Sequence, residues 1–210
     1  MNNLEESNAY LELLIKSIKA VKMPLISYDK NGSAEYVNER AFAYELYRQM
    51  ANRLYDDVTS YLCERWKEER PEIVINAELY KNVGAGNTED EKGRKFPDIV
   101  IHGGQHNTDK QLLVCEIKVE ASKEKIQEDL KKLRDYMDNE KMFNHPYCIA
   151  IFINVGSIEK FYKNLLSLDT NTIKKQGLFF VSYDKGKVQI IDSTEIIEKY
   201  FKDISKLCMI

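Results

Sequence analysis

The sequence has few cysteines and no long apolar run. Its four cysteines, Cys63, Cys115, Cys148 and Cys208, are far apart and form no CxxC pair, which excludes a disulfide scaffold and a zinc ribbon. No segment approaches the roughly 18 uninterrupted apolar residues that a membrane helix needs. The acidic start, MNNLEESNAYLELLIK, lacks the charged-then-apolar pattern of a signal peptide. We therefore expect a cytoplasmic protein with reduced thiols and no membrane partner.

The chain also lacks an excess of positive charge. Its formal net charge is −3 over 210 residues, which argues against a large DNA-binding surface. A small cleft that binds phosphate remains compatible with this charge, because a local patch can be basic while the opposite face is acidic. The fractions of hydrophobic residues, 43%, and charged residues, 31%, are those of an ordinary globular domain.

Apolar periodicity predicts alternating helices and strands. A helical stripe over residues 4–21 and a hairpin around Lys30-Asn31-Gly32 precede a long helix that begins near Asn38. From there the predicted order is α-β-β-β-α-β, typical of an α/β fold with a mixed sheet flanked by helices. We assign residues 1–36 to an N-terminal arm and 37–210 to the main domain. The stripe packs either on its own domain or against a second copy or another protein.

Two neighbouring strands, FPDIVIHGG at 96–104 and QLLVCEIKVE at 111–120, carry charges where they leave the core. Because side chains alternate along a strand, Leu112, Val114, Glu116 and Lys118 are expected on one face. If the strands pair antiparallel, the start of the first lies beside the end of the second. Asp98 would then lie against Glu116 and Lys118.

Two carboxylates and an amine at one sheet edge suit metal-assisted chemistry. Mg²⁺ prefers oxygen ligands and is commonly held by one or two carboxylates together with substrate phosphate. A lysine beside it can orient an attacking water or stabilise an anionic transition state. The pattern therefore predicts hydrolysis of a phosphodiester with Mg²⁺, for which Mn²⁺ would substitute. The simpler reading of Glu116 and Lys118 is a surface ion pair, and that of Asp98 is a turn cap after Pro97.

Pro97-Asp98 followed by Glu116-Ile117-Lys118 resembles the signature of the PD-(D/E)XK nuclease superfamily, over roughly residues 38–155. The resemblance implies a restriction-endonuclease-like fold. It implies that Asp98, Glu116 and the Ile117 carbonyl bind the metal and that Lys118 serves the nucleophilic water. It also implies a bacterial or mobile-element setting in DNA restriction, repair or defence.

Members of this superfamily often supply a further glutamate from the preceding helix. Glu39 lies on the same stripe as Phe42 and Leu46, whereas Glu45 is rotated off it. We therefore choose Glu39 as a metal ligand and catalytic residue, although a glutamate at a helix start is also favourable without any catalytic role. Glu78 is a further candidate.

The run KEKIQEDLKKLR, which follows the motif, alternates in charge and is interpreted as a solvated helix face, with Lys125 and Lys132 near enough to reach phosphates. The leading prediction is a Mg²⁺-dependent DNA nuclease. The alternatives are a catalytically inactive binding or assembly module of the same fold, and a nuclease that acts on RNA.

Overall fold

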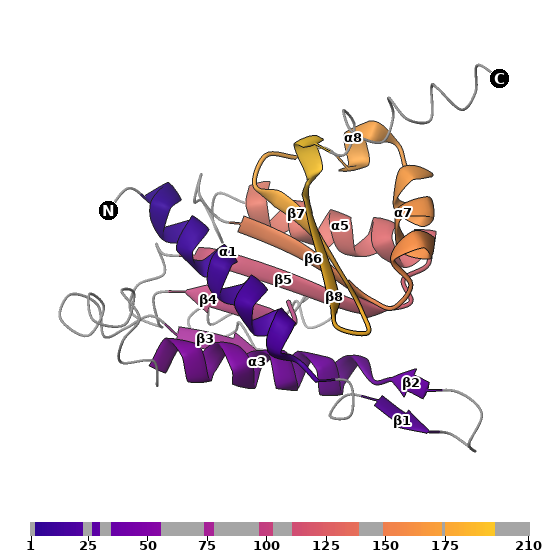
Figure 1. Ribbon diagram of the computed structural model, residues 1–210. Helices are drawn as coiled ribbons and strands as arrows, with labels where there is room; N and C mark the ends of the chain where they lie inside the picture. The colour runs from indigo at the N-terminus through magenta and orange to yellow at the C-terminus, as the bar shows by residue number, and fades with distance from the viewer. Residues whose placement is uncertain are drawn as a thin grey trace, which may run out of the picture.

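The computed structural model describes residues 3–22, 27–29, 35–55, 74–77, 97–102, 111–138, 149–173 and 175–195. The elements are α1 (Asn3–Ala20), β1 (Ser27–Asp29), β2 (Glu35–Val37), α3 (Glu39–Tyr55), β3 (Val74–Ala77), β4 (Ile99–His102), β5 (Gln111–Val119), α5 (Lys123–Asp138), β6 (Ile149–Val155), α7 (Ile158–Leu166), α8 (Thr170–Ile173), β7 (Leu178–Asp184) and β8 (Lys187–Asp192). The described residues form one mixed sheet with helices on both faces and a separate β1-β2 hairpin (Figure 1). The predicted α/β class is confirmed.

The sheet has six strands in the order β3-β4-β5-β6-β7-β8. Pairing is antiparallel from β3 through β5, parallel from β5 through β7, and antiparallel again between β7 and β8. Helix α5 connects the parallel neighbours β5 and β6, as a parallel pair requires. The chain order α3-β3-β4-β5-α5-β6 is the predicted α-β-β-β-α-β order.

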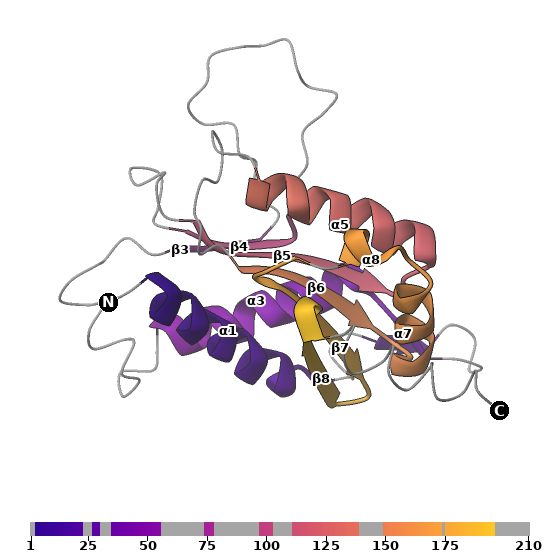
Figure 2. The same ribbon diagram turned by 90° about the horizontal axis from the view of Figure 1, so that it is seen from above.

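Two helical layers cover the sheet, with α1 and α3 on one face and α5, α7 and α8 on the other (Figure 2). All seven residues of β6 are buried, which explains its uninterrupted apolar sequence. Ile151 and Ile153 pack in the core cluster that includes α1 and α3. Ala150 and Phe152 pack in the cluster on the α5 side. Strand alternation therefore gives the protein two cores, one on each face of the sheet.

Helix α1 belongs to the first of these cores. Tyr10, Leu14 and Ile18 are fully buried in the same cluster as Phe42 and Leu46 of α3. The apolar stripe that the sequence assigned to an N-terminal arm therefore covers this protein's own sheet, and its buried residues are not left to a second copy. None of the described helices is long and apolar enough to cross a membrane.

Helix ends follow local capping groups. Helix α7 begins at Ile158, because the Ser157 hydroxyl accepts a hydrogen bond of 3.2 Å from the Lys160 amide as its N-cap. Asp169 plays the same part for the short helix α8, which the sequence did not predict, through a 3.1 Å bond from the Thr172 amide.

The packing of α1 predicts a large difference between two alanine variants in that helix. Leu14→Ala removes a fully buried side chain, which should lower the free energy of unfolding by about 2–5 kcal/mol. Glu12→Ala removes a side chain that is 73% exposed and only loosely paired with Lys16, and should cost less than about 1 kcal/mol. Urea denaturation measures both, and an equally small effect of the two would contradict a core role for α1.

Candidate functional site

The end of β5 directs two charged side chains toward α5. Val114 packs in the core on the α5 side, whereas Cys115 and Ile117 pack on the opposite side. Glu116 and Lys118, which alternate with them, therefore share the face of Val114 as predicted, and this face is covered by α5. Leu112 departs from the prediction and joins the α1-α3 core. The cause is a register shift in the β4-β5 ladder between Ile101 and His102, which places an extra residue in β5.

Asp98 lies beside this end of β5. The predicted antiparallel pairing of the two strands is confirmed, with Ile99 opposite Cys115. The Asp98 amide donates to the Cys115 carbonyl at 3.0 Å, and Asp98 Oδ2 accepts a 2.6 Å hydrogen bond from the Ile117 amide. The preceding residue, Pro97, has no N–H with which to continue the ladder. The aspartate side chain therefore takes the strand amide where pairing ends.

Helix α3 brings Glu39 to the same place. Its Oε1 accepts a 3.2 Å hydrogen bond from Lys118 Nζ, and its Oε2 accepts one of 3.2 Å from the Val119 amide. Glu45, the other candidate in this helix, is bound instead by Arg48 and Gln49. The structure thus brings Glu39, and not Glu45, to the ExK strand. Glu78 lies outside the described residues.

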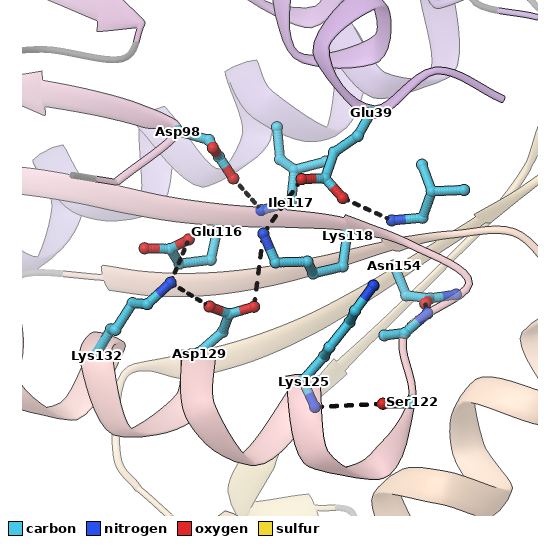
Figure 3. Close-up of polar contacts among 12 residues, drawn as sticks. Glu39, Asp98, Glu116, Ile117, Lys118, Ser122, Lys125, Asp129, Lys132 and Asn154 are labelled. Atoms are coloured by element: carbon cyan, nitrogen blue, oxygen red, sulfur yellow. Dashed lines mark hydrogen bonds and ion pairs between the residues drawn. The ribbon is translucent and has the colours of Figure 1, made fainter. Parts of the chain in front are cut away.

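Helix α5 supplies Lys132, which the sequence placed within reach of substrate phosphate, and two residues that the sequence did not assign to the site, Asp129 and Tyr136. Asp129 is 2% exposed, and its Oδ1 accepts a 2.5 Å bond from Lys132 Nζ while its Oδ2 lies 3.7 Å from Lys118 Nζ. Lys132 Nζ also lies 3.9 Å from Glu116 Oε2 (Figure 3). Tyr136, one turn further on, is buried. Burial, followed by the charges of Glu116 and Asp98, raises the pKa of its hydroxyl.

The interpretation of KEKIQEDLKKLR as a solvated face holds for its exposed residues but is wrong for Asp129. A sequence signal was available: Asp129 follows Ile126 by three residues and precedes Leu133 by four, which places it on the apolar stripe of the helix. Both of those neighbours are fully buried. A single acid on an apolar stripe indicates that the acid is buried beside a partner. The alternation of charges along the helix led instead to the interpretation of Asp129 as solvated.

Two asparagines fix α5 relative to β5. The chain turns after β5 at Glu120, whose φ is +49°. Asn154 Oδ1 of β6 accepts a 3.0 Å bond from the Ala121 amide, and Asn164 Nδ2 of α7 donates one of 3.0 Å to the Ala121 carbonyl. Both backbone polar groups of Ala121 are thereby satisfied. The start of α5 is held in place, and its next turns lie over Glu116 and Lys118.

Burial is the main cause that raises the pKa of both acids on the strands, and repulsion from neighbouring acids adds to it. Glu116 is 1% exposed. Burial, followed by the charge of Asp98, raises its pKa to about 8. Burial also raises the pKa of Asp98 to about 6, against the opposing hydrogen bond from Ile117. At neutral pH the metal-free site therefore retains a proton on Glu116.

The pKa values of the two lysines are also raised, which for an amine favours the charged form. Burial acts to lower the pKa of Lys118, but the charges of Asp129, Glu39 and Asp98 outweigh it and raise that pKa above its usual value. The pKa of Lys132 is also raised, because the hydrogen bond to Asp129 and the charge of Glu116 outweigh burial. Both side chains are ammonium ions at neutral pH, so Lys118 can donate hydrogen bonds but cannot act as a base.

The donor set fits a cation at Asp98 and Glu116. Glu116 Oε1 is buried without a hydrogen-bond partner, and a shared cation would relieve the repulsion that raises the pKa of this acid. Among the described residues, no group of three or more His, Cys, Asp or Glu side chains is arranged to hold a metal ion. Mg²⁺ does not require such a group, since one or two carboxylates with waters and substrate phosphate suffice.

Comparison with protein-family models, curated proteins and solved structures finds no match to the chain.

The raised pKa of Glu116 predicts how stability depends on pH without metal. The unfolded chain releases this proton near 4.5, whereas the folded protein holds it to about 8. The folded state thus binds more protons in this interval, and the free energy of unfolding falls as pH rises through it. Urea denaturation at pH 6 and pH 8 with a chelator present should show the loss. Glu116→Gln should be much less sensitive to pH, and an equal slope in both proteins would contradict the prediction.

Proposed function

We propose that the chain is a metal-dependent nuclease of the PD-(D/E)XK type that hydrolyses DNA phosphodiester bonds. The observation that carries the proposal is the meeting of Asp98 and Glu116 on adjacent strands, both with raised pKa values, beside the ammonium of Lys118. A pair of acids, one buried and one half-buried, with a cation next to it is more typical of a functional site than of a surface ion pair.

The element order supports a restriction-endonuclease-like fold for this chain. The acids lie where the predicted resemblance requires them, at the start of β4 and near the end of β5, with a helix before and a helix after. Helix α3 adds an acid from the face opposite α5, so the lysine is approached from both layers.

Asp98, Glu116 and the Ile117 carbonyl would hold Mg²⁺, with Mn²⁺ as a substitute. When bound, the ion would lower the pKa of a water molecule and neutralise charge on a phosphoryl oxygen. The Ile117 amide already fixes one oxygen of Asp98, which orients the carboxylate. The burial of Glu116 excludes bulk water from its side of the site, so the charge of a bound ion would be screened little there.

Lys118 would donate hydrogen bonds to the attacking water or to a phosphate oxygen. Its side chain is 20% exposed, so the ammonium is reachable while its direction is fixed by neighbours. Glu39 would act chiefly as the residue that holds Lys118, because both of its oxygens already accept hydrogen bonds. It would join Asp98 and Glu116 as a metal ligand only by giving up one of these bonds.

The first test is cleavage of supercoiled plasmid, single-stranded DNA and RNA with Mg²⁺ or Mn²⁺. We expect cutting of DNA that stops with a chelator, and a fall of at least about 100-fold in Lys118→Ala, the usual range for loss of a positioned catalytic group. Lys131→Ala removes the same charge from an exposed position on α5 and should retain activity.

Each alternative gives a different result in this test. Preferential cutting of RNA would change the substrate class and leave the site in place. Binding of DNA without cutting under any metal would favour the inactive binding module, with which the net charge of −3 is also compatible. Absence of cutting of every substrate, whether or not Mn²⁺ binds in calorimetry, would refute the nuclease.

The two glutamates of α3 provide a matched pair of variants. Glu39→Gln weakens the hold on Lys118 and should lower kcat by about 10- to 100-fold, since loss of orientation at a catalytic group costs this much. Glu45→Gln disrupts the pairing with Arg48 but no contact of Lys118, and should leave kcat within about twofold. Steady-state cleavage assays measure kcat for both variants. Equal losses of kcat would contradict a role for Glu39 in holding Lys118.

A further inference from the structure

We propose that Asp129 is a positioning residue, through which α5 holds the two lysines of the site, Lys118 and Lys132, in their working places. The inference rests on the proposed nuclease function and adds a residue that lies outside the PD…ExK motif. It is carried by the contacts of one carboxylate that is almost completely buried between two ammonium groups.

Among the described residues, Lys118 and Lys132 are the groups that contact the carboxylate of Asp129. Its Oδ1 takes a 2.5 Å hydrogen bond from Lys132 Nζ. Its Oδ2 has no hydrogen bond and lies 3.7 Å from Lys118 Nζ. A buried carboxylate costs several kcal/mol in desolvation, so this acid is tolerated because two cations compensate for it. Figure 3 shows it between the two lysines.

Asp129 and Glu39 hold the ammonium group of Lys118 from the two helical layers of the protein. Glu39 of α3 binds the ammonium at 3.2 Å, and Asp129 of α5 approaches it from the other face of the sheet. Long lysine side chains lose up to about 2 kcal/mol of rotamer entropy when they are fixed. Two acids that share one ammonium supply the attraction that keeps it in a single place.

The second lysine is aimed at the acids on the strands. Lys132 Nζ lies 3.9 Å from Glu116 Oε2 while it remains bound to Asp129, and its side chain is 30% exposed. Without Asp129 the two ammonium groups would repel each other, with Glu116 and Glu39 their remaining acidic contacts here. We infer that both would turn toward solvent, and that Lys132 would no longer lie where it can meet a substrate phosphate.

Asp129→Asn tests the proposal, because it keeps the shape of the side chain and removes its charge. We expect kcat for Mg²⁺-dependent DNA cleavage to fall by about 10- to 100-fold, as displacement of catalytic groups does. KM should change less than threefold and the Kd for Mn²⁺, measured by calorimetry, less than tenfold, since Asp98 and Glu116 are unchanged. Glu128→Gln removes a charge from the exposed neighbouring position and should have no effect on kcat.

A cycle of variants shows whether Asp129 acts through the lysines. In a background of Lys118→Met with Lys132→Met, adding Asp129→Asn should lower residual cleavage by less than about threefold, because the groups it positions are already absent. Multiplicative losses would overturn the proposal, as would full activity of Asp129→Asn alone. Thermal unfolding of Leu133→Ala, a core variant of the same helix, supplies the control: lower stability with unchanged kcat.

Two further results separate this inference from the proposed function. Native protein that binds Mn²⁺ but cuts nothing refutes the nuclease and the positioning role together. Native protein that cuts, with Asp129→Asn equally active, refutes the positioning role alone. If Asp129→Asn does not fold, the pair Asp129→Asn with Lys132→Met removes one acid and one cation together. It should fold and still lose at least about 10-fold in kcat relative to Lys132→Met.

Discussion

The need to compensate charge that has left water governs the arrangement around the end of β5. Glu116, 1% exposed, retains a proton at neutral pH, whereas Asp129, 2% exposed, could not remain there as a carboxylate without cations nearby. Lys118 and Lys132 provide them, and in doing so connect β5 to α5 and, through Glu39, to α3. The position of each element near the site is therefore fixed by ionic contacts as well as by the two apolar cores.

This compensation is incomplete in the metal-free protein. The pKa of Glu116 remains raised to about 8 by burial and by Asp98, although Lys132 lies close to it. One oxygen of Glu116 and one of Asp129 have no hydrogen bond. Sites that must accept a cation and an anionic substrate are expected to store such unfavourable electrostatics, because the ligand then relieves them. The site thus departs from the rule of full pairing where the proposed chemistry would occur.

The helices contribute unequally to what is proposed here. Helix α3 contributes Glu39 at its first residue, where an acid is also favoured by the helix dipole. Helix α5 contributes Asp129, Lys132 and Tyr136 from one stripe that runs over β5. Its orientation depends on Asn154 and Asn164, which bind the backbone amide and the backbone carbonyl of Ala121. Residues far in sequence from the proposed metal ligands therefore set the geometry of the lysines.

The sequence by itself determined the strands, most of the helices and the meeting of Asp98 with Glu116 and Lys118. These follow from local periodicity and from the antiparallel pairing of two consecutive strands, both of which are encoded in a short stretch of chain. Only the tertiary structure decided which residues of the helices pack against these strands and contact the charged side chains at their ends. That α1 covers the sheet, and that Asp129 is buried between two lysines, depends on contacts between α1 and α3 and between α5 and β5. Charge alternation along a helix gives no sign of which charge will be buried, because burial depends on the layer that packs against it.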